Sequence, residues 1–367
     1  MKARSKAPDM VLFYTVLILL GIGVVMVYSA SAVSANVNFN DSYYFLKRQL
    51  IWAALGLVAM VWTMNTDYHM WQKLAKPILW ITVILLILVL VPGMGKVVNG
   101  ARRWLGFGSF YLQPSEIAKL SMVIFMSYNL TKYQERLQFF VKGLVPQLIV
   151  LLVIFGLILK EPDLGTALSI AGTVFVMLFV AGARVSHMGA LGGFGAAGVT
   201  AAVLLEPYRL KRLIAFSDPW ADPLNTGYHI IQSLYAIGSG GLFGVGLGRS
   251  REKFLYLPEP HTDFIFSILG EELGLIGTIT VVLLFFIFAW RGLKIAMSAS
   301  DIYGSILATG LTTMILLQAV MNIAVVTASM PVTGIPLPFL SFGGSALIFT
   351  LAGVGILLNI SRQVNLK

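Results

Sequence analysis

Cysteine is absent from the 367 residues, and only 11% of them are Asp, Glu, Lys or Arg. Without cysteine the chain has no disulfide framework, no thiol nucleophile and no cysteine metal site. Four scattered histidines do not indicate a zinc cluster, and neither an HExxH motif nor a phosphate-binding GxxxxGK[ST] motif occurs. Hydrophobic residues make up 57% of the chain. This leaves too little polar surface for a soluble globular protein and indicates a protein of the membrane.

Long runs without charge predict an all-α, polytopic integral membrane protein with ten transmembrane helices, because about 20 apolar residues cross a bilayer as a helix. The expected spans are residues 10–32, 49–66, 77–95, 114–131, 143–159, 164–183, 185–205, 264–290, 303–329 and 341–361. Residues 223–248 are also uncharged. Their glycine-rich run GSGGLFGVGLG disfavours an eleventh span and leaves an interfacial helix or a re-entrant turn open.

The distribution of Lys and Arg predicts that both termini lie in the cytoplasm. With that orientation the cytoplasmic segments hold thirteen Lys and Arg, and the short outer segments hold six. The whole chain, 1–367, then forms one membrane domain with two polar extracytoplasmic loops, 94–113 and 207–262. The larger loop lies between the seventh and eighth helices.

The two outer loops bring positive charge and aromatic rings to one membrane face. Such a combination suits an anionic amphiphile, for example a lipid-linked diphosphate, and it suits interfacial anchoring equally. Nucleic acid is not expected at this face. The cations and rings are Arg102, Arg103, Arg209, Lys211, Arg212, Arg249, Arg251 and Lys253 with Trp104, Phe107, Tyr208 and Tyr256.

The stretch LPEPHTDFIF, residues 257–266, places a carboxylate directly before an apolar run. Two prolines disfavour helix ahead of that run, so Asp263 is expected near the first turn of the helix. A carboxylate at a dry helix N-terminus can serve as a general base, and a plain N-cap is the alternative. Glu259 and His261 lie beside it in the sequence, which favours a catalytic role.

Carboxylates also occur inside or beside other apolar runs. Glu116 and Lys119 lie three residues apart on one helical face, which predicts an ion pair in a functional cavity or a purely architectural one. Glu161 and Asp163 are expected to act as helix caps or polar contacts. At least one of the adjacent glutamates Glu271 and Glu272 is expected to face a wet interior or a hydrogen-bond donor. Two aspartates in DPWADP, residues 218–223, indicate a turn, or a divalent cation with a diphosphate.

Eight stretches together resemble the SEDS family of shape, elongation, division and sporulation proteins. They occur in the family's order and cover nearly the whole chain: NGARRWL, QPSEIAK, EPDLGT, PYRLKR, DPWADP, GYHIIQSLYAIGSGGLFGVGLGRS, YLPEPHTDFIFSILGEELG and PVTGIPLPFLSFGGS. Within the family the chain looks closest to division and sporulation members. Its Pro260-His261 pair is a minor variation on the family's pattern.

The resemblance implies a ten-helix peptidoglycan glycosyltransferase of the bacterial cytoplasmic membrane, which polymerises lipid II at the outer face beside a class B penicillin-binding protein. Asp263 matches the family's essential aspartate, and Glu116 and Lys119 match its polar pair on the fourth span. Arg102, Trp104 and Arg209 fall in outer motifs around the central cavity.

These observations combine into one hypothesis with two alternatives. Asp263 is expected to be the general base, while arginines of the outer loops, with or without Mg²⁺ or Mn²⁺, stabilise the departing undecaprenyl diphosphate. The expected substrate-binding residues are Arg102, Arg103, Trp104, Glu116, Lys119, Arg209, Arg212, Lys253, Glu259 and His261, and no protein metal ligand is expected. The alternatives are a lipid II flippase and a non-catalytic scaffold for division or sporulation wall synthesis.

Overall fold

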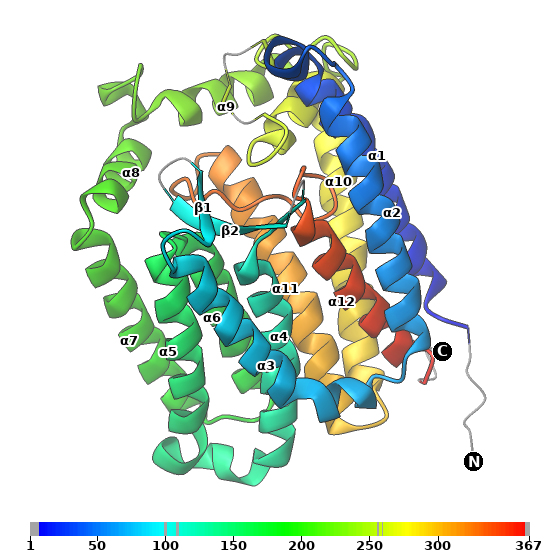
Figure 1. Cartoon of the computed structure of the whole chain (residues 1–367), viewed down its shortest axis with the longest axis vertical. Coiled ribbons are helices and arrows are strands. Elements are labelled where there is room, and N and C mark those ends of the chain that lie inside the picture. The colour runs from blue at the N-terminus through cyan, green and yellow to red at the C-terminus, as the bar shows by residue number, and fades with distance from the viewer. Residues whose placement is uncertain (1–6, 99–100, 108–109, 255–256, 259, 364–367) are drawn as a thin grey trace.

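Long helices form the body of the protein, and short helices, a sheet and loops gather toward one end of it (Figure 1). The structure is a computed structural model that describes residues 7–98, 101–107, 110–254, 257–258 and 260–363. Its long helices are α1 (Met10–Phe39), α2 (Tyr44–Asn65), α3 (His69–Leu90), α4 (Pro114–Lys132), α5 (Val145–Lys160), α6 (Leu164–Val180), α7 (Val185–Leu204), α10 (Ile265–Ser298), α11 (Ile302–Val326) and α12 (Ser345–Ser361). Two shorter helices, α8 (Pro207–Ser217) and α9 (Tyr228–Ser239), follow α7.

In the described part of the chain, seven helical segments are long and apolar enough to cross a membrane. They are α1, α2, α3, α7, α10, α11 and Phe140–Lys160, in which the turn Phe140–Leu144 precedes α5. Helices α6 and α12 are apolar but have 17 residues each. The chain is therefore a mostly helical, multi-pass membrane protein.

Some helices extend beyond the predicted spans because those spans were bounded by charges. Helix α3 begins at His69 and contains Pro77, where the predicted span began. Helix α10 continues past Arg291 and Lys294 to Ser298. A helix can leave the apolar layer without ending, so the first charge does not mark its last residue.

The segment 94–113, expected as an outer loop, contains a small antiparallel sheet. Its strands are β1 (Gly95–Val98), β2 (Ala101–Phe107) and β3 (Phe110–Leu112), in the order β1-β2-β3. Lys96 lies opposite Trp104, and Gly106 lies opposite Tyr111. Since alternate residues share a face of a sheet, Lys96, Trp104 and Tyr111 lie on the same face. The strands are too short and too rich in Gly and Arg to give an alternating pattern in the sequence.

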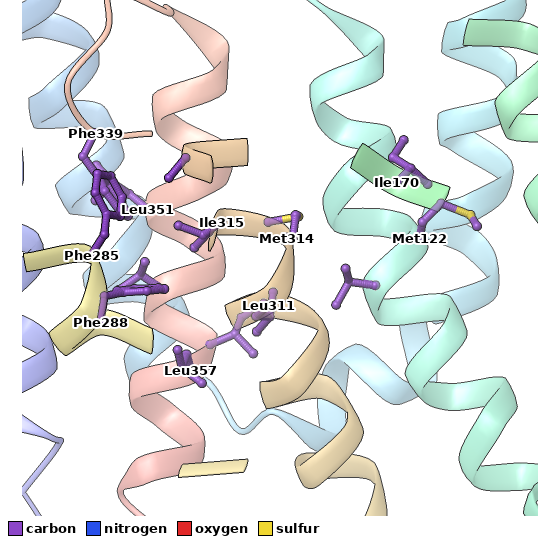
Figure 2. Close-up of a cluster of buried hydrophobic side chains, with 14 of the residues drawn as sticks. Met122, Ile170, Phe285, Phe288, Leu311, Met314, Ile315, Phe339, Leu351 and Leu357 are labelled. Atoms are coloured by element: carbon purple, nitrogen blue, oxygen red, sulfur yellow. The ribbon is translucent and has the colours of Figure 1, made fainter. Parts of the chain in front are cut away.

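Apolar side chains fill the space between the central helices (Figure 2). Phe285 and Phe288 of α10 pack near Phe339, which belongs to the loop between α11 and α12. Leu311 and Ile315 of α11 lie between α10, α12 and α4 in the same cluster, together with Met122, Ile170, Met314, Leu351 and Leu357. Helix α7 stands at the edge of the bundle, and Met188 is its one buried residue among those described.

The segment between α11 and α12, residues 327–344, lies without helix or strand beside the loop that precedes α10. Backbone N–H of Phe342 donates to the carbonyl of His261 at 2.9 Å. The hydroxyl of Ser341 donates to the carbonyl of Thr262 at 2.6 Å and accepts from the N–H of Leu337 at 2.8 Å. These bonds satisfy non-helical backbone that would otherwise be costly close to a membrane.

Candidate active site

A cavity of about 980 Å³ lies among the sheet, the ends of several helices and the two loops just described. This volume is near the upper end of the range of ligand pockets, about 300–1,000 Å³. The residues around it come from α1, α2, the sheet, α4, α6, α8, α12, the loop before α10 and the segment between α11 and α12. They include Asn38, Arg48, Trp52, Lys96, Arg103, Trp104, Tyr111, Gln113, Glu116, Asp163, Thr166, Tyr208, Arg212, Lys253, His261, Thr262, Asp263, Thr333, Gly334 and Gly344.

Five cations and three carboxylates line this cavity. The cations are Arg48, Lys96, Arg103, Arg212 and Lys253, and the carboxylates are Glu116, Asp163 and Asp263. The cations come from four separate parts of the chain: α2, the sheet, α8 and the loop before α10. A site of this composition can hold an anionic group while presenting a carboxylate to another part of the same ligand.

Asp263 directly precedes Phe264, the N-cap residue of α10. Its main chain is held by a hydrogen bond from α11. The side-chain amide of Asn322, on α11, donates to the carbonyl of Asp263 at 2.8 Å. The same amide nitrogen donates to the carbonyl of Ile335 at 2.8 Å. A Cβ placed on Gly334, which has a φ of 73°, would lie 3.5 Å from Oδ2 of Asp263. Helix α11 therefore holds the main chain at Asp263, and the segment after it passes beside the carboxylate.

Glu116 and Lys119 form the predicted ion pair in the first turns of α4, with 2.8 Å between Oε2 and Nζ. Both side chains are buried, and Glu116 reaches the cavity wall while Lys119 lies behind it. Lys119 also donates to Oε1 of Gln318 at 2.6 Å, and Gln318 donates to the carbonyl of Pro336 at 2.8 Å. The pair thus connects α4 to α11 and to the segment that approaches Asp263.

Two arginines that line the cavity come from the sheet and from α8. Arg103, on β2, donates through Nε to the carbonyl of Glu161 at 2.9 Å and through its guanidinium to the carbonyl of Pro162. Arg212, on α8, donates to the carbonyl of Val332 at 2.8 Å and lies over the ring of Tyr208. Both guanidinium groups are therefore oriented by backbone carbonyls near the cavity.

His261 lines the cavity as a buried aromatic ring. Its ring centroid lies 4.2 Å from that of Phe45 and 5.8 Å from that of Phe342. Burial lowers the pKa of His261 to about 4. The imidazole is therefore neutral at physiological pH, and it offers packing and a hydrogen bond to a ligand but no charge.

The structure brings seven of the eleven predicted site residues to this cavity, namely Arg103, Trp104, Glu116, Arg212, Lys253, His261 and Asp263. Three others lie elsewhere: Arg102 is exposed on β2, Lys119 is behind Glu116, and Arg209 donates to the carbonyl of Ala202 at 2.9 Å. Glu259 falls outside the described residues.

Several cavity residues were not predicted. Arg48 and Lys96 entered the sequence analysis only in the count of Lys and Arg that predicts the orientation of the chain. Both line the cavity, where Lys96 donates to the hydroxyl of Tyr111 at 2.7 Å. Asp163, expected as a cap, does cap α6 by accepting from the N–H of Thr166 at 3.1 Å, and it also reaches the cavity. A lone cation in a short loop gives no signal that separates a ligand contact from an interfacial anchor.

The carboxylates of DPWADP take part in turns. Asp218 accepts from the N–H of Trp220, and Asp222 accepts from Asn225 and Thr226. Among the residues that the structure describes, no three or more His, Asp or Glu side chains are grouped so that they could hold a metal ion.

The comparisons with known proteins agree on one family. The family model described as cell cycle protein, FtsW/RodA/SpoVE, matches residues 9–366. Stage V sporulation protein E of Bacillus subtilis (strain 168) is 51% identical over 362 residues, which are 99% of each chain. The probable peptidoglycan glycosyltransferase FtsW of Trichlorobacter lovleyi is 48% identical over 358 residues, 98% of this chain and 94% of that protein.

Solved structures show the same fold. A chain from the structure titled "Structural coordination of polymerization and crosslinking by a peptidoglycan synthase complex" matches with a TM-score of 0.80 and 32% identity, over 97% of this chain and 98% of that chain. The rod shape determining protein RodA of Thermus thermophilus matches with a TM-score of 0.71 and 30% identity, over 97% of each chain. The resemblance inferred from the motifs is confirmed, and the chain belongs to the FtsW/RodA/SpoVE family of SEDS proteins.

Proposed function

We propose that the protein is a peptidoglycan glycosyltransferase that joins lipid II units into glycan strands and releases undecaprenyl diphosphate. The observation that carries this proposal is the position of Asp263 on the wall of a cavity that also holds five cations. Relatives that are 48% and 44% identical are named probable peptidoglycan glycosyltransferase FtsW. A carboxylate beside fixed positive charge is what the transfer of a sugar from a diphosphate needs.

In the proposed step, the 4-hydroxyl of one sugar attacks the anomeric carbon of a lipid-linked sugar. Asp263 accepts the hydroxyl proton as the new C–O bond forms and the bond to the diphosphate oxygen breaks. The diphosphate leaves with the bonding electron pair, and Arg and Lys side chains of the cavity stabilise its negative charge. General-base catalysis of this kind contributes about 10²–10⁴-fold to the rate.

The proposal includes a topology. Helices α4, α6 and α12 cross the membrane in addition to the seven long segments, which gives ten spans with both termini inside. The cavity, the sheet, α8 and α9 then all lie on the extracytoplasmic side, where lipid II sugars are exposed. The backbone N–H of Asp9 donates to the hydroxyl of Ser361 at 3.0 Å, which supports placing both ends of the chain on one side.

A class B penicillin-binding protein is the proposed partner. A matching solved chain belongs to a structure described as a peptidoglycan synthase complex for polymerization and crosslinking, and that description supports a crosslinking enzyme beside this one.

The decisive experiment measures glycan chain length from purified protein and lipid II in detergent micelles. Asp263→Asn keeps the side-chain volume and removes the base, so we expect polymerisation to fall by about 10²–10⁴-fold. Asp218→Asn, in an outer turn away from the cavity, is the matched control and is expected to keep wild-type activity. A micelle has no second leaflet, so chain growth there cannot result from lipid flipping. Full activity of Asp263→Asn would refute the proposed base, and absence of wild-type activity would favour the flippase or scaffold alternatives.

A further inference from the structure

Helix α10 is broken within its outer half, and a glycine loop fills the break. Gly274 has φ 66° and ψ −162°, which no α-helix allows. In an unbroken helix the N–H groups of Leu275 and Ile276 would bind the carbonyls of Glu271 and Glu272. They bind the carbonyls of Gly241 and Leu242 instead, at 2.9 and 3.3 Å.

The carbonyls released by the break are bound by the same loop. Val245 donates its N–H to the carbonyl of Glu271 at 3.0 Å, and Gly246 donates to the carbonyl of Glu272 at 3.1 Å. Glycine is required here, because a Cβ on Gly244 would collide with the backbone of Glu272. Residues 241–246 and the first part of α10 are therefore joined through their main chains.

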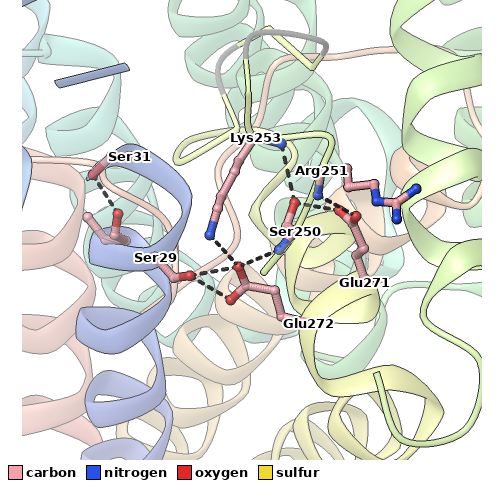
Figure 3. A network of polar contacts seen from close by, with 8 residues as sticks. Ser29, Ser31, Ser250, Arg251, Lys253, Glu271 and Glu272 are labelled. Carbon is pink, nitrogen blue, oxygen red and sulfur yellow. Dashed lines mark hydrogen bonds and ion pairs between the residues drawn. The ribbon is translucent and has the colours of Figure 1, made fainter. Parts of the chain in front are cut away.

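The two glutamates at the break hold the next stretch of the loop with their side chains (Figure 3). Glu271 accepts from the hydroxyl of Ser250 at 2.5 Å and from the N–H of Arg251 at 2.7 Å. Glu272 points to the other side, toward α1, where the hydroxyl of Ser29 lies 2.8 and 2.6 Å from its two carboxylate oxygens.

Glu272 also binds the one cation of this loop that reaches the cavity. Nζ of Lys253 lies 2.9 Å from Oε1 of Glu272, and Lys253 is 4% exposed. The N–H of Ser250 donates to the same oxygen at 3.3 Å, and the hydroxyl of Ser250 accepts from the N–H of Lys253 at 3.2 Å. The Lys253 ammonium is thus fixed by a carboxylate whose other contacts come from α1 and from the loop itself.

We propose that Glu272 is a positioning residue that holds the Lys253 ammonium at the cavity wall, where it binds the diphosphate of the lipid-linked substrate. The inference rests on the proposed function and adds a residue that the sequence analysis did not include among the site residues. An ammonium group has three N–H donors, and the ion pair with Glu272 uses one, which leaves donors for a ligand in the cavity. The carboxylate compensates the buried charge, and Ser29 fixes the carboxylate.

The geometry explains why both partners are needed. Without Glu272 the loop would carry a buried cation with no counter-charge, which is unfavourable, so Lys253 would move away from the wall. Without Lys253 the carboxylate would keep its hydrogen bonds from Ser29 and Ser250 but lose its counter-charge, and the cavity would lose one of its five cations. Either change removes the same cation from the diphosphate.

The test is a double-mutant cycle read out by the dissociation constant for undecaprenyl diphosphate and by the KM for lipid II. Glu272→Gln and Lys253→Met are each expected to raise both constants about tenfold or more, since a charge-assisted hydrogen bond is lost. The Glu272→Gln/Lys253→Met double variant is expected to match Lys253→Met alone, because Glu272 acts through Lys253. Lys253→Arg, which keeps the charge, is expected to restore most of the affinity.

Thermal unfolding of each variant separates positioning from a merely structural role. If Glu272 has only a structural role, Glu272→Gln lowers stability and kcat but leaves the dissociation constant for undecaprenyl diphosphate unchanged. Its effect on stability and kcat then adds to that of Lys253→Met in the double variant. That result would overturn the inference. The exposed Glu135→Gln, in the turn after α4, is the control. Undecaprenyl diphosphate binding is measured without catalysis, so an inactive wild-type protein would count against the proposed function while the cycle still tests Glu272.

Discussion

The side-chain amide of Asn322 binds the main-chain carbonyl of Asp263 at 2.8 Å, although 59 residues separate the two in the sequence. The same amide binds the carbonyl of Ile335 at 2.8 Å, so one side chain joins α11, the start of α10 and the segment before α12. A general base must stand within hydrogen-bond reach of the proton it takes, and this amide holds the main chain of Asp263, the proposed base.

Asn322→Ala should therefore lower kcat for lipid II polymerisation by about ten- to a hundredfold, because the reacting groups lose their alignment. Asn129→Ala is the matched control. It removes a 2.7 Å hydrogen bond from the Asn129 side-chain amide to Gln147, and Asn129 lies at the end of α4 farther from Glu116. We expect the control to lower the melting temperature and to keep kcat. A wild-type kcat in Asn322→Ala would show that the two amide hydrogen bonds of Asn322 do not set the position of Asp263.

The Glu116–Lys119 pair gives a prediction about stability. Lys119→Met leaves Glu116 buried with a charge that Lys119 no longer compensates, and this should cost about 3–5 kcal/mol. Glu116→Gln/Lys119→Met removes both charges and should recover most of that loss, because a neutral pair needs no counter-charge. Thermal unfolding in detergent measures both variants. If the double variant is as unstable as Lys119→Met, the cost comes from packing rather than from the uncompensated charge.

The sequence predicted those site residues that interrupt an apolar run. Asp263, Glu116 and Lys119 are conspicuous because a charge beside or within a membrane helix is costly, and the structure places all three at or directly behind the cavity wall. Asn322 and Gln318 are uncharged residues of an apolar helix, and their role depends on contacts with residues far away in the sequence.

The long helices could be expected from hydrophobic runs, whereas the structure of the segments between them could not. The β1–β3 sheet depends on pairing of short strands, and the break in α10 depends on a loop that supplies the missing hydrogen bonds. In the sequence, Gly274 lies in an apolar run and does not differ from an ordinary residue of a membrane helix. Only the neighbouring 241–246 loop, placed by tertiary packing, makes a positive φ there possible.

Gly274→Ala tests the helix break. The added Cβ would collide with the backbone of Gly244 and Leu242, and φ 66° is strained for alanine. We expect a loss of at least about 1–3 kcal/mol from backbone strain alone, seen as a lower melting temperature. Gly156→Ala in α5 is the control, since a Cβ there meets no atom within 4 Å. Equal melting temperatures for the two variants would mean that the loop does not fill the break as described.

Glu161 provides a prediction about pH. It lies in the turn between α5 and α6, and neither carboxyl oxygen has a hydrogen-bond partner among the described residues. Burial, with a smaller contribution from Asp163, raises the pKa of Glu161 to about 9 from an ordinary value of 4.5, against the opposing effect of Arg103. The folded protein therefore holds a proton that the unfolded chain releases between these two pH values.

The sign of the pH effect follows from that difference in proton binding. A raised pKa gives stability that is complete below pH 4.5 and is lost as pH rises through 9. Between these limits the wild type should lose about 1.4 kcal/mol per pH unit relative to Glu161→Gln, which cannot release a proton. Melting temperatures are measured in detergent at intervals from pH 6 to pH 8. The melting temperature of the wild type should fall relative to that of Glu161→Gln, so that the two values converge or cross. The exposed Glu206→Gln is the control, and its melting temperatures should run parallel to those of the wild type. Parallel curves for Glu161→Gln would mean that Glu161 is ionised in the folded protein and has found a partner that compensates its charge.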